Sequence, residues 1–179
     1  ETLKRKSEKY PKITTTSSFS DILTSPDIHA IAIATPAEQH YALAKKSLLA
    51  GKHVFVEKPL AMTAQEGEEL VQLAEQQGKT LFVGHILQYH SAVQTIKNML
   101  QEGELGKLQY IYSNRLNLGK IRREENILWS FAPHDISVIL SLVGEEPIEV
   151  TATGTNILHP KIADTTITNM KFSSGVGAH

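Results

Sequence analysis

Residues 52–63, KHVFVEKPLAMT, decide the fold class of this chain. Their apolar, strand-forming run HVFV ends abruptly in Glu57-Lys58-Pro59, which is the pattern of a buried parallel strand with a charged pair at its carboxyl end. In open α/β sheets, ligands bind just outside the carboxyl ends of the strands. A lysine at that place can hold a proton near a reacting oxygen, and the proline beside it fixes the backbone that directs the lysine. The segment therefore predicts a parallel sheet with a functional strand end at Lys58.

The same design recurs on both sides of this segment. One apolar strand precedes it and ends in Thr35-Pro36, and another follows it and ends at Gly84. Amphipathic helical patterns connect the strands, and Thr63 with Glu66 forms a capping box at the start of the second long helix. This alternation is the βαβ signature of a doubly wound sheet, and the near-continuous apolar character of the first strand predicts cover on both faces. The expected strands are residues 29–35, 52–57 and 80–84, and the expected helices are residues 1–10, 20–23, 38–50 and 63–77.

The pattern changes after His85. A helical period returns over residues 90–102 and 129–143, but the strands between and after these helices alternate polar and apolar residues. Such alternation is typical of an antiparallel sheet with one solvated face. We therefore predict an α/β protein with a partial Rossmann-type, doubly wound parallel sheet in residues 1–84, followed by a partial α+β domain with a mainly antiparallel sheet in residues 85–179. The expected strands of this second half are residues 105–116, 149–158 and 165–172, and residues 118–126 form a charged loop.

Composition excludes several classes of function. The hydrophobic fraction (41%) and the charged fraction (21%) are ordinary for a soluble globular protein, and the formal net charge of −1 gives no electrostatic case for nucleic acid or an anionic membrane. No cysteine is present, which excludes disulfides and thiolate catalysis, and the eight histidines lack metal-ligand spacing, so we predict no metal. No apolar run approaches the roughly 20 residues of a membrane span, and the polar N-terminus shows no signal peptide, so we expect a cytoplasmic protein.

The run IAIATPAEQHYALAKKSLLAGKHVFVEKPLAMT, with its A-T-P, H and E-K-P combination, resembles the NAD(P)-dependent glucose–fructose oxidoreductase / inositol dehydrogenase (Gfo/Idh/MocA) family. The resemblance continues through ELGKLQYIYSNRLNLGKIR and NILWSFAPHDISVILSLVG. The HDIS segment and the arginine-rich loop before it are most similar to the UDP-N-acetylglucosamine (uronate) 3-dehydrogenases. The resemblance implies hydride transfer from a sugar hydroxyl to NAD or NADP, a small-molecule sugar or nucleotide-sugar substrate, and a homo-oligomer formed through the antiparallel sheet.

A dinucleotide-binding fold should begin with a strand, a glycine-rich turn and the helix N-terminus that holds the pyrophosphate. The G-x-G-x-x-G pattern does not occur in this sequence, which opens on the helical run ETLKRKSEKY and stops within a strand-turn-strand pattern. We therefore expect a fragment that is truncated at both ends and is itself inactive. The alternative is that Glu1 is the natural start of a processed chain.

Lys58 and His134 are the predicted catalytic residues. Oxidation of a sugar hydroxyl requires that its proton be moved, and Lys58 can stabilise the negative charge that develops on the oxygen. His134 can act as general acid or base near neutral pH, oriented by Asp135 or by a backbone group. The alternatives are a solvent-facing lysine and a capping or core histidine. The family usually has an aspartate one helical turn before this histidine, and Ser130 stands there, so either His134 acts without that partner or the chemistry is slowed or changed.

The resemblance places cofactor contacts at the strand ends. Thr35 and the backbone beside Pro36 would lie along the dinucleotide, with His40 beneath the strand end. Glu57 would position the nicotinamide ribose or anchor the lysine after it, and His85 could touch the nicotinamide or the substrate. The alternatives are a helix residue that faces neighbouring loops for His40 and a surface salt bridge for Glu57. The predicted cofactor-binding residues are Thr35, Pro36, His40, Glu57, Lys58 and His85.

The loop that follows the strand at residues 105–116 carries four cations between residues 114 and 123, NRLNLGKIRR. Arginine binds phosphate or carboxylate in a bidentate manner, so a nucleotide-sugar pyrophosphate or a uronate would fit. The alternative is a solvated loop balanced by Glu124 and Glu125. Arg115 is the best candidate because it ends a strand and matches the family pattern. The predicted substrate-binding residues are Lys58, Arg115, Asn117, Arg122 and His134.

A different class of function competes with the enzyme. Ser130 is also consistent with a non-catalytic protein whose second domain serves ligand sensing or oligomerisation. A third hypothesis is a Rossmann-like ligand-binding module without a redox role, and it is the weakest because Lys58 and His134 both occupy active-site positions. Cofactor turnover separates the first hypothesis from the other two.

Overall fold

The computed structural model describes residues 2–116 and 126–179, and the chain divides into two compact units, Glu1–Gly84 and His85–His179. The first unit contains a three-stranded parallel sheet with the strand order β1-β2-β3. Ile33, Val56 and Val83 are in register across the three strands, so the carboxyl ends of the strands meet at one edge of the sheet. The strands are β1 (Ala30–Ile33), β2 (His53–Val56) and β3 (Leu81–Val83).

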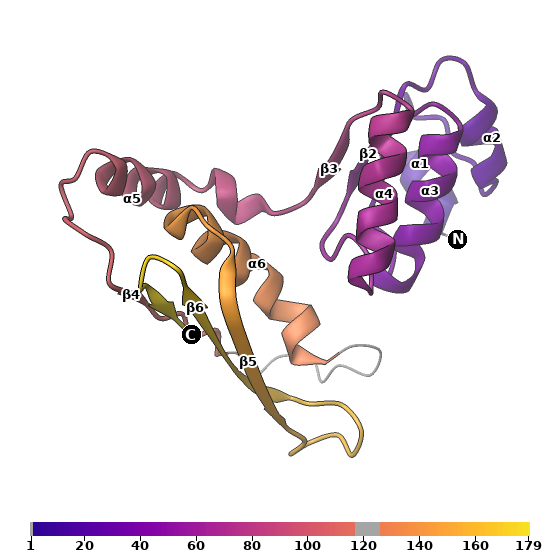
Figure 1. Cartoon of the computed structure of the whole chain (residues 1–179). Helices are drawn as coiled ribbons and strands as arrows, with labels where there is room; N and C mark the ends of the chain where they lie inside the picture. Colours follow the sequence, from indigo (N-terminus) through magenta and orange to yellow (C-terminus); the bar gives the residue numbers. More distant parts are fainter. Residues whose placement is uncertain (1, 117–125) are drawn as a thin grey trace. The chain divides into compact units, whose positions relative to one another are not determined.

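Two long helices cover one face of this sheet (Figure 1). The Thr63 N-cap predicted from the sequence is present at the start of α4, because Glu66 N donates to Thr63 Oγ1 at 3.2 Å. The Glu66 carboxylate reaches back one residue further than in a capping box, since its Oε2 accepts from Met62 N at 3.2 Å. The buried core between sheet and helices consists of Ile31, Ile33, Ala44, Leu48, Val54, Val56, Leu70 and Ala74. The helices of the first unit are α1 (Thr2–Lys9), α2 (Phe19–Thr24), η1 (Ala37–Gln39), α3 (His40–Leu49) and α4 (Ala64–Gln76).

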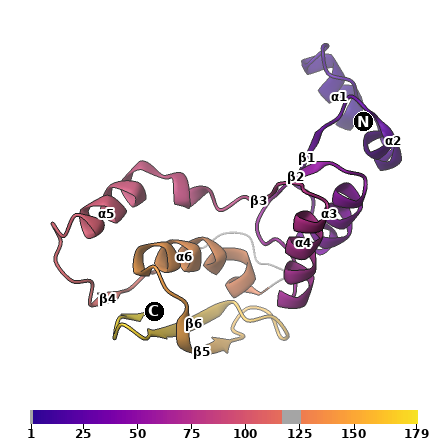
Figure 2. The same ribbon diagram turned by 45° about the horizontal axis from the view of Figure 1, so that its top comes forward.

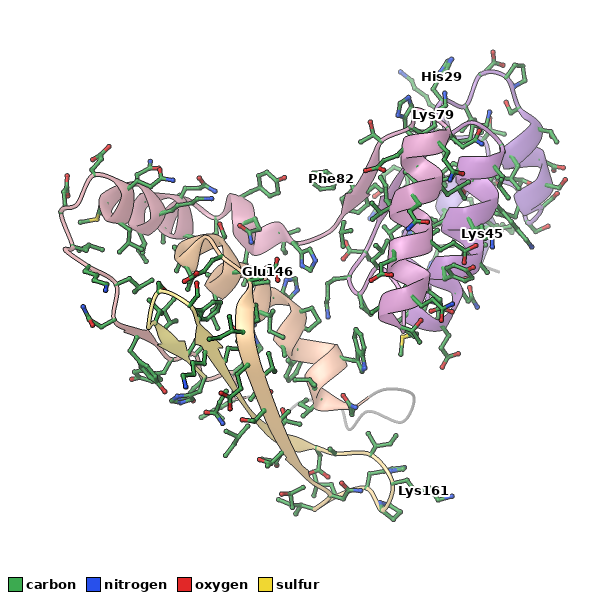
Figure 3. The ribbon with its side chains drawn as sticks, in the orientation of Figure 1. His29, Lys45, Lys79, Phe82, Glu146 and Lys161 are labelled. Carbon is green, nitrogen blue, oxygen red and sulfur yellow. The ribbon has the colours of Figure 1, made fainter. Side chains whose placement is uncertain are left out.

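The sequence predicted that helices cover both faces of the sheet, but residues on the opposite face are exposed. Ala30 and Ala32 are exposed, and Phe82 points away from α3 and α4 and is 40% exposed (Figure 3). Phe55 stacks on Phe82 with the ring centroids 5.6 Å apart. The apolar run of β1 thus alternates large and small side chains, and among the described residues the helices cover only the side that carries the isoleucines.

The second unit is a four-stranded mixed sheet with the order β4-β7-β6-β5, in which β5, β6 and β7 are antiparallel and β4 runs parallel to β7. The helix α6 lies along one face of this sheet (Figures 1 and 2), where Ile139 packs with Met170, Phe172, Val176 and Ala178. The elements are η2 (Ile86–Tyr89), α5 (Ser91–Gln101), β4 (Tyr110–Ile111), α6 (Ile127–Val143), β5 (Pro147–Thr155), β6 (Thr165–Phe172) and β7 (Gly177–Ala178).

The long strand predicted over residues 105–116 is wrong in its extent, because β4 covers only Tyr110–Ile111. A strand requires a partner backbone, and the partner of β4 is the two-residue strand β7. The hydrogen bonds between the two segments begin at Gln109 O and end at Ser113 N. Before them, Gly106 turns the chain with a φ of 69°. Alternating polarity alone therefore overestimated the strand. Among the described residues, no helix is long and apolar enough to cross a membrane.

Candidate functional site

The candidate functional edge of the first unit lies where β1 and β2 end. Thr35 and Pro36 follow β1 and are exposed, while Glu57 and Lys58 follow β2 and are half-buried. Pro59, next to Lys58, is buried. The parallel register brings these segments to the same edge of the sheet, as the sequence predicts. A hydroxyl, a carboxylate and an ammonium group therefore gather at the position where α/β sheets bind their ligands.

The Glu57 side chain lies close to the end of the third strand. Gly84 N donates to Val56 O at 2.7 Å and so continues the sheet. A Cβ atom on Gly84 would lie 3.0 Å from Glu57 Oε2 and 3.3 Å from Phe55 Cζ. The carboxylate of Glu57 thus lies directly against the glycine, and a side chain there would displace it. The sequence located Gly84 as a strand end but not as the glycine that makes room for this carboxylate.

His40 lies beneath this edge, at the first position of α3, and is 1% exposed. Its Nδ1 atom lies 2.7 Å from Pro59 O and its Nε2 atom lies 2.9 Å from Thr35 O. The ring therefore connects the segment after β1 with the segment after β2. The expected position beneath the strand end is found, but both ring nitrogens face backbone carbonyl groups of the chain.

In the second unit, His134 lies in α6 directly after Pro133 and is half-buried. The helix starts at Ile127 because Asn126 caps it, with Trp129 N donating to Asn126 Oδ1 at 3.0 Å. Ser130, one turn before His134, is 1% exposed. The position at which the family resemblance leads one to expect a carboxylate is therefore buried in this chain.

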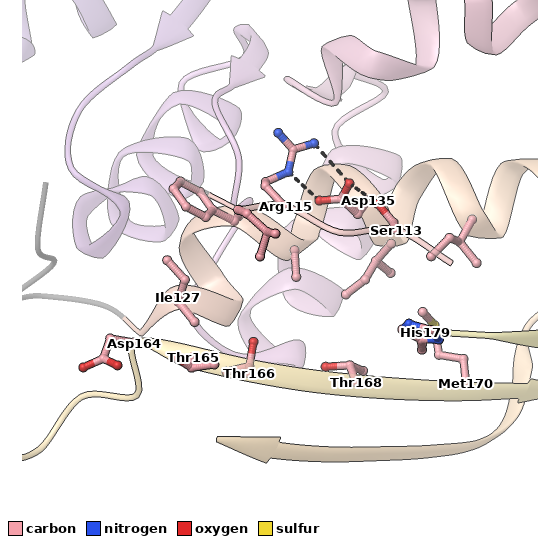
Figure 4. Close-up of a pocket in the computed structure, with 15 residues that line it drawn as sticks. Ser113, Arg115, Ile127, Asp135, Asp164, Thr165, Thr166, Thr168, Met170 and His179 are labelled. Carbon is pink, nitrogen blue, oxygen red and sulfur yellow. Dashed lines mark hydrogen bonds and ion pairs between the residues drawn. The ribbon is translucent and has the colours of Figure 1, made fainter. Parts of the chain in front are cut away.

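Asp135, next to His134, is tied to the segment that follows β4. Arg115 Nε donates to Asp135 Oδ2 at 2.6 Å, Arg115 Nη2 donates to Asp135 Oδ1 at 3.1 Å, and Ser113 Oγ donates to Asp135 Oδ1 at 2.8 Å (Figure 4). Burial acts to raise the pKa of the Asp135 carboxyl, but the hydrogen bonds from Arg115 and Ser113, with the charges of Arg115 and His134, outweigh it and lower that pKa. The same pairing raises the pKa of Arg115.

A cavity of about 310 Å³ lies between α6 and β6 in this unit. Thr166 and Thr168 extend from β6 toward the side where Ser113, Arg115 and Asp135 lie (Figure 4). Thr168 Oγ1 is buried and has no hydrogen-bond partner among the described residues. Apolar side chains complete the wall, so the cavity combines a hydrophobic surface with a few hydroxyl and charged groups, as small-molecule sites commonly do. These apolar residues are Leu116, Ile127, Phe131, Ala132, Ile136, Ile139 and Met170.

The remaining predicted residues fall into two groups. His85 follows β3 in the sequence and caps η2 as a half-buried residue of the second unit. Asn117 and Arg122 lie outside the described residues. Within the described parts of the chain, no group of three or more His, Cys, Asp or Glu residues could hold a metal ion.

The sequence missed the hydroxyl groups of the cavity and the partner of Arg115. Ser113 and Arg115 are two residues apart in an extended segment, which places them on one face, and this spacing was a usable signal. Asp135 was expected only as a partner of His134. Its pairing with Arg115 joins residues 20 positions apart, and no local pattern predicts it.

Comparison with known proteins now gives the family. Residues 2–85 match the model of an oxidoreductase family with an NAD-binding Rossmann fold, and residues 93–179 match the model of the GFO/IDH/MocA C-terminal domain. The chain belongs to the GFO/IDH/MocA oxidoreductase family. The resemblance seen in the sequence is thereby confirmed, as are the fold class and an NAD-type dinucleotide as the cofactor.

Among the relatives of this GFO/IDH/MocA chain is the UDP-N-acetylglucosamine 3-dehydrogenase of Acidithiobacillus ferrooxidans, which is 30% identical over 86% of this chain and 48% of that protein. The solved structure of that organism's UDP-N-acetylglucosamine 3-dehydrogenase GnnA matches 99% of this chain and 56% of that chain with a TM-score of 0.84 and 28% identity. A 2,7-anhydro-N-acetylneuraminate hydratase of Mediterraneibacter gnavus is 30% identical over 82% of this chain and 43% of that protein. The chain spans about half the length of these curated relatives.

Proposed function

We propose that this chain is part of an NAD(P)-dependent dehydrogenase that removes hydride from a hydroxyl-bearing carbon of a sugar. The observation that carries the proposal is the strand-end edge of the first unit, where Lys58 follows β2 and the exposed Thr35 follows the neighbouring strand β1. This edge belongs to a chain of an NAD-binding oxidoreductase family. When bound, the nicotinamide supplies the acceptor for the hydride.

Lys58 is the proposed proton carrier. The sugar hydroxyl loses its proton as its carbon loses hydride, so a group at the oxygen must accept the proton and stabilise the negative charge that develops there. A lysine in its neutral form accepts the proton, and as an ammonium group it stabilises the oxygen. The half-buried position of Lys58 at the strand end suits both roles, because the surrounding protein strengthens its interaction with the oxygen.

The cofactor-binding part of the proposal uses the same edge. Exposed Thr35 and Pro36 offer a hydroxyl and a backbone carbonyl along the sheet edge. Glu57, held against Gly84, offers a carboxylate that can accept hydrogen bonds from ribose hydroxyls. His85, which follows β3, is the proposed further contact.

His134 is the second proposed acid–base residue. Its neighbour Asp135 is held in one place by Arg115 and Ser113, so the segment of α6 that carries His134 is tied to the end of β4. A carboxylate close to an imidazole favours its charged form. Asp135 can therefore supply, from the next position in the chain, part of the electrostatic support that a carboxylate at position 130 would give.

The proposed substrate is a nucleotide-linked amino sugar or its uronate. The cavity of the second unit offers three hydroxyl groups, from Ser113, Thr166 and Thr168, beside an apolar wall, which suits a sugar ring. Arg115 has more N–H donors than the two that Asp135 receives, so it can also bind a phosphate or carboxylate group. Asn117 and Arg122, which lie outside the described residues, are proposed to contribute as well. Two relatives whose names mention N-acetylated amino sugars support this class of substrate.

A homo-oligomer formed through the outer face of the second sheet is part of the proposal. Tyr110, Ile167 and Lys171 lie on the face that points away from α6, and Tyr110 and Ile167 are 54% and 57% exposed. Aromatic and aliphatic side chains on a broad sheet face are typical of subunit interfaces. The mass of the complete protein in solution, measured by light scattering, tests this part.

The second candidate is a non-catalytic sensor of the same ligands, which the buried Ser130 in place of a carboxylate favours. A direct test uses the complete protein with UDP-N-acetylglucosamine, or its uronate, labelled with deuterium at the carbon to be oxidised. We expect deuterium in the reduced nicotinamide and a ketosugar product, both lost in Lys58→Met. Binding of the sugar without any transfer of deuterium would support the sensor and contradict the dehydrogenase.

A further inference from the structure

His40 makes two contacts with the functional edge from the buried side. The ring is 1% exposed, with Nδ1 2.7 Å from Pro59 O and Nε2 2.9 Å from Thr35 O. These carbonyl groups belong to segments that are 24 residues apart in sequence and follow neighbouring strands. Pro59 directly follows Lys58, and Thr35 directly precedes Pro36.

Both contacts have the geometry of hydrogen bonds in which the ring is the donor. A carbonyl oxygen only accepts hydrogen bonds, so each ring nitrogen can bond to its carbonyl only when it carries a proton: a neutral ring donates one of the two bonds, and an imidazolium donates both. A buried carbonyl group without a donor is unfavourable, because it has lost its hydrogen bonds to water. With both nitrogens protonated, His40 satisfies acceptors on both segments at once, which a residue present only to fill space would not do.

Each of the two segments contains a proline that lacks a backbone donor. Proline has no backbone N–H, so neither Pro36 nor Pro59 can donate a hydrogen bond that would anchor its segment. The sheet ladder ends just before them, with Glu57 N donating to Ile33 O at 2.9 Å. Beyond that bond, the two contacts of the His40 ring also join these segments.

We infer that His40 is a positioning residue that holds two parts of the site at once, the cofactor-facing segment at Thr35 through Nε2 and the lysine-bearing segment at Pro59 through Nδ1. The inference rests on the proposed function for its catalytic consequences, because it assigns the Lys58 segment to proton transfer. The sequence suggested that the His40 ring contacts the cofactor directly. The inference instead gives the ring an indirect role, through the backbone carbonyl groups of Thr35 and Pro59. Small displacements of a reacting group lower rates steeply, so the hold on Lys58 should affect turnover.

The two contacts can be removed one at a time. The amide nitrogen of asparagine is the same number of bonds from Cα as Nδ1 of histidine, so His40→Asn can keep the donor to Pro59 O and lose the one to Thr35 O. The amide nitrogen of glutamine is the same number of bonds from Cα as Nε2, so His40→Gln can keep the donor to Thr35 O and lose the one to Pro59 O. Both variants place a neutral amide in the same buried space, and their melting temperatures show whether they lose stability equally.

Steady-state kinetics of the complete enzyme should split the two variants in opposite directions. For His40→Gln we expect kcat to fall about ten- to a hundredfold, with the dissociation constant of the cofactor changed less than about threefold. For His40→Asn we expect the dissociation constant to rise about fivefold to tenfold, which is the effect of one lost hydrogen bond, with a smaller change in kcat. His29→Asn replaces an exposed histidine of the same unit and serves as the matched control, with both constants unchanged.

Hydrogen exchange without cofactor or substrate provides a readout that does not depend on activity. His40→Gln should speed exchange in residues 58–62, and His40→Asn should speed it in residues 35–39. If the two variants lose kcat and cofactor affinity in the same ratio, or if exchange rises equally in both segments, His40 is a core residue only and the inference is wrong. If the parent enzyme transfers no hydride, the proposed function fails, and the exchange pattern still decides the role of His40.

Discussion

The strand end of the first unit and the His134 segment of the second unit are held in place by different kinds of interaction. The strand end at Lys58 depends on the parallel ladder and on the buried His40 ring, which is 1% exposed. The segment of α6 at His134 depends on an ion pair between side chains of Arg115 and Asp135 that are 39% and 20% exposed. Buried backbone-directed bonds are strong and insensitive to salt, whereas partly exposed ion pairs contribute little and are screened. We therefore expect the strand end of the first unit to be the more rigid region, and the His134 segment of the second unit to be the region that salt can loosen.

Lys58→Met gives the largest effect that we expect. Methionine keeps the length of the side chain but cannot hold a proton or stabilise an oxyanion, and the loss of such an interaction lowers rates on the order of a hundredfold or more. The turnover number of the complete enzyme measures this, and calorimetric titration should show cofactor binding nearly intact. Lys46→Met, an exposed lysine of α3, is the matched control. If Lys58→Met keeps a turnover number within a few-fold of that of the parent enzyme, Lys58 does not take part in the proton transfer.

His134→Asn tests the second region on the same scale. We expect a loss of roughly a hundredfold in kcat, as for other general acid–base groups. Ser130→Ala should be mild, because serine is no acid or base. Ser130→Asp should raise the pKa of His134, since an anion one helical turn away favours the imidazolium, and the pH–rate profile should shift accordingly. If His134→Asn is as active as the parent enzyme, the helix α6 is scaffold and Lys58 carries the proton alone.

Arg115→Ala should affect substrate binding more than turnover. An arginine that binds a phosphate or carboxylate far from the reacting carbon contributes to KM, and we expect KM to rise about tenfold with a smaller change in kcat. Asp135→Asn is the informative partner variant, because it breaks the ion pair but keeps the arginine. Equal changes in KM and kcat for the two variants would mean that Arg115 acts only by holding Asp135.

The difference between the two regions also explains what the sequence could predict. Strand ends follow from local patterns, because an apolar run followed by Glu57-Lys58-Pro59 needs no knowledge of distant residues. The second region depends on pairs such as Arg115 with Asp135, which only the folded chain brings together. The strand at residues 105–116 was overestimated for the same reason, since its true length is set by its partner β7. The double contact of His40 lies between these cases, because its position was predicted and its partners were not.

Gly84→Ala sharpens the comparison within the rigid region. A methyl group at this position would lie 3.0 Å from Glu57 Oε2 and 3.3 Å from Phe55 Cζ, so the carboxylate must move. If Glu57 positions the cofactor, we expect the KM for the cofactor to rise a few-fold, with little change in kcat. Gly67→Ala is the control, because a methyl group there meets Leu60 at an ordinary 3.9 Å and alanine favours the helix by about 1 kcal/mol. An unchanged KM in Gly84→Ala would show that the carboxylate has no role in cofactor binding.

The smallest expected effect concerns the acid stability of the second region. The folded-state pKa of Asp135 is lowered, so its contribution to stability is present above the unfolded value of about 3.9 and is lost as the pH falls through the folded-state pKa. Because the ion pair is partly exposed, solvent screening limits the contribution to about 1 kcal/mol. Trp129, the only tryptophan in the chain, lies in α6 and reports urea unfolding of this unit by fluorescence. Asp135→Asn should be less stable than the parent at pH 7, and the difference should shrink toward pH 3. A difference that is the same at both pH values would show that Asp135 stabilises the unit by packing, and the contrast with the rigid strand end would then lose its electrostatic basis.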